Sequence, residues 1–260
     1  GFTKVVIPST ISNIGTHAFA YSHNISVVES YSRYVGEYMF YNCYKEGSTF
    51  QFTSANASEV GNETILTLGT GVPNQIYIGS HVLSIGDFAF ANCEELTKVI
   101  FPSSNGVVIN KHAFNYNKAL VELINLNYVQ TVGDYAFANT SVNNIEIASN
   151  ATYGEGVFFQ SNIEVVTIGA NTTFGLGAFQ NCAKLTTVNM PNANVEFGRG
   201  CFAYCSLLSK IDLSYVEKIP EECFYSCSNL LRVNLANCKE IGNYAFSDCA
   251  KIVRVLVPKI

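Results

Sequence analysis

The chain has 260 residues, of which 48% are hydrophobic and 13% are charged, and its formal net charge is −5. The apolar fraction excludes a disordered chain, and the negative charge argues against non-specific nucleic-acid binding and against a basic membrane-surface protein. No apolar run approaches the roughly 20 residues that a membrane helix needs, so we expect neither nucleic-acid binding nor membrane insertion from this segment.

A phrase centred on Phe recurs from the start of the chain to its end. In its clearest form it runs from Ile85 to Cys93, with Phe90 as its anchor. The equivalent anchors, each preceded by a small or modest apolar residue, are Phe19, Phe40, Phe114, Phe137, Phe158, Phe179, Phe202, Phe224 and Phe246. Glycine recurs four residues before most anchors, and a small or polar residue, often Cys, recurs three residues after them. This self-similarity indicates a repeat architecture.

Residues 44–80 depart from the pattern. The gap between Phe40 and Phe90 is about twice the others, and Ile65 fits as the anchor of a degenerate copy. With Ile65 the chain has eleven anchors, and their mean spacing of about 23 residues is within the range of leucine-rich repeats. The segment is predicted to be an irregular repeat or an insertion that protrudes as a loop.

A second phrase lies between the anchors and predicts a short β-strand. It reads Leu96-x-x-Val99-x-Phe101-Pro102, and it returns at residues 163–168, 185–190, 208–213, 230–235 and 252–257. Apolar residues alternate in it with a period of two, and Pro, Asn or Ser bound it. The phrase around each anchor is too short for a stable helix of its own, so it predicts a turn or a short helical segment with the glycine at a bend.

The two phrases together predict a solenoid. One repeat cannot bury its own Phe and strand residues, whereas stacked repeats bury them in a continuous core. The strands of successive repeats then form a parallel sheet. The chain ends on a strand phrase without a polar capping repeat, so we expect it to be a fragment of a longer chain.

These phrases resemble the leucine-rich repeat family, and the extended phrase from Val82 to Pro102 is similar to its BspA-like surface-protein branch. The resemblance covers nearly the whole chain. It implies a single α/β solenoid over residues 1–260, a right-handed superhelix of about eleven repeats of about 23 residues with its parallel β-sheet on the concave face. It also implies a secreted, extracellular or cell-surface protein that adheres to host proteins or to other cells.

Four of the nine cysteines form two Cys-x3-Cys motifs, Cys201 with Cys205 and Cys223 with Cys227. Four thiolates of this kind are compatible with tetrahedral zinc coordination. However, the two pairs are one repeat apart, and Cys205 and Cys227 occupy the same repeat position as four other cysteines. Cys201 and Cys223 occupy a position where Ala is usual, and a free Cys behaves as a small hydrophobic residue. We therefore favour a ladder of buried thiols over a metal site.

Catalytic motifs are missing from the sequence. It contains no phosphate-binding loop, no nucleophile elbow and no His-Glu-x-x-His arrangement. His17 and His112 share one repeat position, two residues before the anchor, and nothing gives either of them a catalytic setting. We predict no enzyme, no cofactor and no metal.

The outward positions of the strands carry the candidate binding residues. Lys210, Arg232 and Arg254 fall at one position of three successive late repeats, about 5 Å apart if the strands pair. The candidate ligand-binding residues, which include the neighbouring polar side chains, are Lys210, Asp212, Arg232, Asn234 and Arg254. Stacked like charges are mildly destabilising, so this column of cations either binds an acidic partner or is a solvated sheet face.

The function that these observations favour is recognition or adhesion. We expect the module to bind a host or partner protein through the solenoid face. Two alternatives stay open: a structural spacer or stalk of a larger surface protein, and a module that binds glycans.

Overall fold

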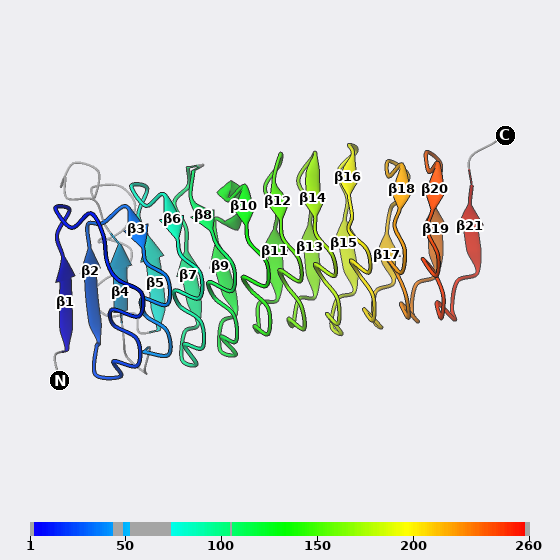
Figure 1. Ribbon diagram of the computed structural model, residues 1–260. Coiled ribbons are helices and arrows are strands. Elements are labelled where there is room, and N and C mark those ends of the chain that lie inside the picture. The colour runs from blue at the N-terminus through cyan, green and yellow to red at the C-terminus, as the bar shows by residue number, and fades with distance from the viewer. Residues whose placement is uncertain (1–2, 44–48, 53–73, 105, 258–260) are drawn as a thin grey trace.

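The computed structural model describes residues 3–43, 49–52, 74–104 and 106–257, and these residues form a parallel β-solenoid of about ten turns. Figure 1 shows the turns side by side in one elongated row, with the two ends of the chain at opposite ends of the row. Each turn supplies a strand to a first row, usually a shorter strand to a second row, and then a tight turn that carries the anchor Phe.

The first strand row consists of three parallel sheets in succession. Its strands are β1 (Lys4–Ile7), β2 (Val27–Ser30), β4 (Thr49–Phe52), β5 (Gln75–Ile78), β7 (Lys98–Ile100) and β9 (Glu122–Ile124), then β11 (Asn144–Glu146), β13 (Val165–Thr167), β15 (Thr187–Asn189) and β17 (Lys210–Ile211), then β19 (Arg232–Asn234) and β21 (Arg254–Leu256). In most strands the central residue is buried and its neighbours face outward, as the period-two alternation predicted.

The second strand row is parallel as well, and its strands are two or three residues long. They are β3 (Tyr34–Val35), β6 (Ser84–Ile85), β8 (Val108–Ile109), β10 (Thr131–Val132), β12 (Thr152–Tyr153), β14 (Thr172–Phe174) and β16 (Val195–Glu196), followed by the pair β18 (Lys218–Ile219) and β20 (Glu240–Ile241).

The predicted α/β character needs correction for the part of the chain that the structure describes. The helix found there is η1 (Leu126–Tyr128), a single 3-10 turn. Around the anchors the chain instead makes tight turns that hydrogen-bond to the next turn of the solenoid. The amide of Phe90, for example, donates to the carbonyl oxygen of Ala113 at 2.8 Å. This ladder satisfies the backbone without any helix. The right-handed twist and the concave curvature stay predictions.

The ten anchor Phe rings form one stacked column through the core. Neighbouring ring centroids lie between 5.2 Å, for Phe179 and Phe202, and 5.7 Å, for Phe137 and Phe158. The rings between the two ends of the column are fully buried. The column predicted from the spacing of Phe is therefore confirmed.

The first and second rows differ in the region of the predicted irregular repeat. In the first row β4 lies between β2 and β5, whereas in the second row β3 pairs directly with β6. Phe40 likewise stacks directly on Phe90 at 5.6 Å, so this column has no room for an eleventh side chain between them. Ile65, the eleventh anchor of the sequence pattern, lies outside the described residues, as does most of the segment 44–80.

The recurring glycine before each anchor has a packing role that differs from the predicted bend. A Cβ atom on Gly86 would lie 2.8 Å from backbone atoms of residues 35–37 in the preceding turn. At Gly86 glycine is therefore required because the backbones of neighbouring turns approach too closely for a side chain, although Asn110 and Pro220 occupy the equivalent position in two other turns.

Two other turn positions adopt the left-handed backbone conformation. They lie two residues before and two residues after every anchor, as at Phe88 and Asn92 (φ 54° and 57°). Because both positions recur in every turn, they form two columns along the solenoid.

Candidate functional site

The outward side of the first strand row, which we call the strand face, carries all five predicted binding residues. Arg232 on β19 and Arg254 on β21 lie in register on adjacent strands. Asn234 Nδ2 lies 3.4 Å from Asp212 Oδ1, which also accepts a hydrogen bond of 3.0 Å from the amide of Ser214. The structure thus pairs Arg232 with Arg254 and Asp212 with Asn234, whereas Lys210 lies on β17, which belongs to a separate sheet and is in register with Thr187. We call the three cations Lys210, Arg232 and Arg254 the cationic column.

The cationic column differs from the cations at the other end of the strand face. Lys4 binds Glu29 at 2.8 Å, and Lys98 binds Glu122 at 2.7 Å, in each case across to the next strand of the sheet. Among the described residues, no carboxylate forms an ion pair with Lys210, Arg232 or Arg254. All three side chains are exposed, so their charges are available to a partner.

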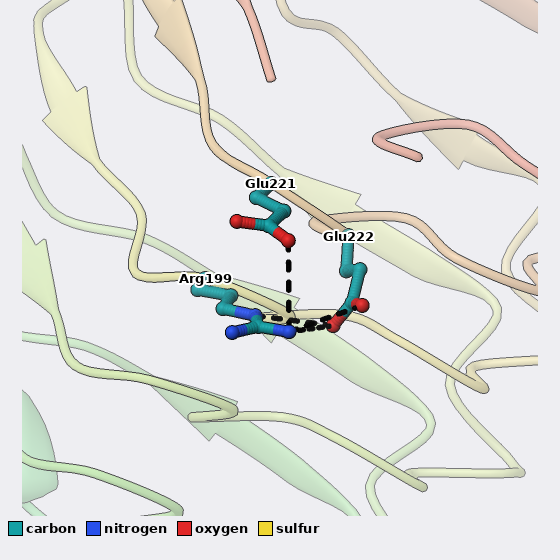
Figure 2. Close-up of polar contacts among 3 residues, drawn as sticks. All are labelled: Arg199, Glu221 and Glu222. Carbon is teal, nitrogen blue, oxygen red and sulfur yellow. Dashed lines mark hydrogen bonds and ion pairs between the residues drawn. The ribbon is translucent and has the colours of Figure 1, made fainter. Parts of the chain in front are cut away.

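Several charges away from the strand face are paired between turns. Lys218 binds Glu240 at 2.9 Å, and Lys239 binds Glu217 at 2.9 Å. Figure 2 shows a third contact, in which the guanidinium of Arg199 meets both carboxylate oxygens of Glu222 at 3.1–3.2 Å and approaches Glu221 at 3.6 Å.

These contacts perturb the ionisation of exposed groups without creating a reactive centre. The hydrogen bond with Glu222 raises the pKa of Arg199 above its ordinary value. The bond between Lys111 and Asp134, 2.8 Å long, raises the pKa of the lysine and lowers the pKa of the carboxyl. Each group is thereby held in its charged form, which suits an ion pair and not an acid or base that exchanges protons near neutral pH.

The histidines His17 and His112 belong to a second ring column that the sequence analysis did not identify. Its members occupy the left-handed position two residues before the anchor and stack with centroid distances of 4.3–5.2 Å: His17, Tyr38, Phe88, His112 and Tyr135. Partial burial in this stack lowers the pKa of His112. The sequence signal for this column was the recurrence of aromatic or imidazole rings at one repeat position. Such a recurrence indicates that the rings of successive turns stack on one another.

The four cysteines of the zinc alternative are buried free thiols in the core. Cys205 Sγ donates to the carbonyl oxygen of Phe179 at 3.1 Å, and Cys227 Sγ donates to that of Phe202 at 3.1 Å. Within the part of the chain that the structure describes, no three His, Cys, Asp or Glu side chains gather in a way that could hold a metal ion. The buried thiol ladder is confirmed for these residues.

A hollow in the strand face is the other feature that the sequence analysis missed. It has a volume of about 520 Å³ and lies where the first row is interrupted, between β9 and β11. Its walls include Ile124, Tyr128, Asn144 and Glu146. Nothing in the repeat pattern indicated that the sheet would break at this point.

Comparison with known proteins identifies the repeat. The family model described as "BspA type Leucine rich repeat region (6 copies)" matches residues 1–65, 73–175 and 154–260. No match was found among curated proteins. No helix in the described ranges is both long and apolar enough to cross a membrane.

Solved structures similar to this chain come from several bacteria. A leucine-rich repeat protein from Bacteroides ovatus is 22% identical, with a TM-score of 0.49 over 97% of this chain and 86% of that chain. A leucine-rich repeat protein from T. pallidum is 21% identical, with a TM-score of 0.47 over 69% of this chain and 78% of that chain. A leucine-rich cell surface protein from Faecalibacterium prausnitzii is 17% identical, with a TM-score of 0.36 over 100% of this chain and 88% of that chain.

Proposed function

This chain belongs to the BspA-type leucine-rich repeat family, and from that premise we propose that it is a non-catalytic recognition module, extracellular or on the cell surface, that binds an acidic region of a partner protein. The strand face is the binding surface, and the cationic column of Lys210, Arg232 and Arg254 is its charged centre. Asp212 and Asn234 lie beside the column and provide hydrogen-bonding groups. The cell-surface location rests on the family resemblance.

The observation that supports this proposal is that cations at one end of the strand face have carboxylate partners, whereas the cations at the other end have none among the residues that the structure describes. Lys4 and Lys98 each have a carboxylate partner on the next strand, whereas Arg232 faces Arg254 in register. Like charges that face each other across strands lower the stability of the sheet. A partner that supplies carboxylates removes this repulsion, so the binding free energy includes the relief of an unfavourable contact.

The rigidity of the strand face supports the same conclusion. Lys210 and Arg232 each precede a residue that is buried in the common core, Ile211 and Val233, whereas Arg254 lies on the exposed strand β21 and is held by its pairing with β19. A surface held in place before binding loses little conformational entropy when the partner arrives. Complementary charge also speeds association and sets specificity more than it sets affinity.

The spacer alternative predicts a different surface. A stalk without a ligand site needs only a neutral, solvated face. Unpaired cations would slightly lower its stability and would serve no purpose in it. The strand face is uneven, with paired charges at one end and the cationic column at the other, and this favours recognition over a spacer.

The test is a triple charge reversal, Lys210→Glu with Arg232→Glu and Arg254→Glu. The matched control is Lys118→Glu with Lys184→Glu and Lys251→Glu, which changes the net charge equally at exposed lysines outside the strand face. Both variants and the unmodified chain are immobilised and incubated with detergent-solubilised cell-surface and extracellular-matrix proteins, at low and at physiological ionic strength.

We expect the unmodified chain and the control to retain a common partner, in amounts that fall as salt screens the contact. The strand-face variant should lose that partner while its circular dichroism spectrum and unfolding midpoint stay the same. Equal retention by the strand-face variant would show that the cationic column has no part in recognition, and the spacer would then be the better account.

A further inference from the structure

The hollow between β9 and β11 originates in a local change of the chain path. Asn125 follows β9 directly and adopts the left-handed conformation, with φ 64°. Its side-chain amide donates to the carbonyl oxygen of Phe101 in the preceding turn at 2.9 Å, which fixes the bend. The chain then forms η1, which lies against β11, and β9 and β11 belong to separate sheets.

This interruption uncovers one apolar side chain that is covered in other turns, and it lies beside two apolar side chains at outward positions. The central residue of β9, Leu123, is only half-buried, whereas the equivalent Val99 and Ile145 are buried. Ile124 is 40% exposed, and the half-buried Val165 also contributes to the lining. The hollow therefore has apolar side chains on both sides of the break among a mostly polar lining. Its volume is within the size range of small-ligand sites, roughly 300–1,000 Å³.

Neutral polar groups and one carboxylate surround these apolar side chains. The side chains of Asn127, Tyr128, Asn144 and Glu146 make no hydrogen bond or ion pair with any other described residue. Glu122 lies on the adjacent strand, but Lys98 neutralises it at 2.7 Å. Glu146 thus keeps its full hydrogen-bonding capacity, unlike Glu122.

The chemistry of these groups selects a class of ligand. Amide side chains both donate and accept hydrogen bonds, and a tyrosine hydroxyl does the same, so together they match hydroxyl groups, which also donate and accept. The residues that line the hollow include no Lys, Arg or His, and Glu146 repels an anion. Apolar side chains together with convergent polar groups suit a ligand that has a hydroxylated edge and a C–H face.

We propose that the hollow binds a neutral oligosaccharide. The sugar ring packs its C–H face on Leu123, Ile124 and Val165, and its hydroxyl groups exchange hydrogen bonds with Asn144 and Glu146 on one side and with Asn127 and Tyr128 on the other. This site is separate from the cationic column, so it does not depend on the protein-recognition proposal.

The experiment screens the 260-residue chain against a printed array of neutral, sialylated and sulfated oligosaccharides. The strongest neutral binder is then titrated by calorimetry into three proteins: the unmodified chain, the hollow variant Asn144→Ala with Glu146→Ala, and the control Glu94→Ala with Asn192→Ala. The control removes the same two chemical groups from exposed positions outside the hollow. Two-dimensional 1H–15N spectra of the unmodified chain identify the residues that the sugar contacts.

We expect a neutral glycan to bind and the hollow variant to bind it about tenfold or more weakly, because two hydrogen bonds are lost. The control should bind as the unmodified chain does, and shifted amides should include residues 122–128 and 144–146. The proposal is overturned if no neutral glycan binds, if only anionic glycans bind, or if the hollow variant binds as tightly as the control. If the hollow variant fails to fold, the amide shifts of the unmodified chain decide the question alone.

Discussion

Cys205 Sγ lies 3.1 Å from the carbonyl oxygen of Phe179, the anchor of the preceding turn. The same contact recurs between Cys182 and Phe158, at 3.1 Å, and Ser161 Oγ makes it with Phe137 at 2.8 Å. The carbonyl oxygens of Phe158 and Phe179 also accept an amide from their own turn, as Phe179 does from Cys182. The position three residues after the anchor is therefore selected for a side-chain donor, and small size alone does not explain it.

This relationship predicts opposite preferences at two neighbouring cysteines. Cys205→Ser keeps a donor, as Ser161 does, and should be more stable than Cys205→Ala by about 0.5–1.5 kcal/mol, the net value of one hydrogen bond. Cys201 is the control, because Ala89 and Ala178 occupy its position in other turns, so there Ala should be at least as stable as Ser. Urea denaturation of the four variants measures the order, and equal stability of the two Cys205 variants would contradict the donor role.

The buried thiols also predict loss of stability at alkaline pH. Burial raises the pKa of Cys182 from 9.0 to about 12, and that of Cys249 to about 11. Above pH 9 the unfolded chain loses thiol protons that the folded chain keeps, so the contribution is complete below about pH 9 and declines as the pH rises toward 12. Urea titrations under reducing conditions should show this decline. It should be less steep in Cys182→Ser, and parallel curves for the two proteins would count against the prediction.

Gly156 and Gly200 occupy the same repeat position, but a side chain would collide with the ring of Tyr135 only at Gly156. Gly156 and Gly200 both have positive φ, 52° and 61°, but a Cβ on Gly156 would overlap the ring of Tyr135, whereas the nearest atom to a Cβ on Gly200 is 3.8 Å away. Gly200→Ala should cost about 1–2 kcal/mol through backbone strain alone. Gly156→Ala should cost more, and the excess should disappear when Tyr135 is also changed to Ala. A double-mutant cycle measures this coupling, and strict additivity would refute it.

The Phe column predicts where truncation is most damaging. Phe137 stacks between Phe114 and Phe158 and is fully buried, so Phe137→Ala should lower the free energy of unfolding by about 3–5 kcal/mol. Phe19, at one end of the column, is only partly buried, and Phe19→Ala should cost less. The two variants are compared by urea unfolding, and a cost as large at Phe19 as at Phe137 would mean that the column does not form the centre of the core.

Features that repeat could be predicted from the sequence. The spacing of Phe90, Phe114 and Phe137 was enough to predict their stacking, because identical turns place identical residues above one another. The alternation in β19 placed Arg232 outward and Val233 inward, and register between equivalent strands then placed Arg232 beside Arg254. The predicted binding residues were therefore located on one face, although their use in binding is a proposal.

Features that occur once could not be predicted in this way. The break after β9 depends on Asn125 and η1, yet Asn150 and Asn171 also have positive φ in turns where the chain forms no helix. The difference lies in how the segment packs on its neighbours, and a single sequence does not record that. The side chains of the hollow come from two turns, so no contiguous motif marks them.

The additional strand β4 makes the sides of the solenoid unequal near its beginning. Between β2 and β5 the first row spans two strand spacings, about 9.6 Å, while between β3 and β6 the second row spans one, about 4.8 Å. A stack whose sides differ in height turns toward the shorter side. We therefore expect the long axis of the protein to bend toward the second row at this point, so that Lys4 and the cationic column face in different directions.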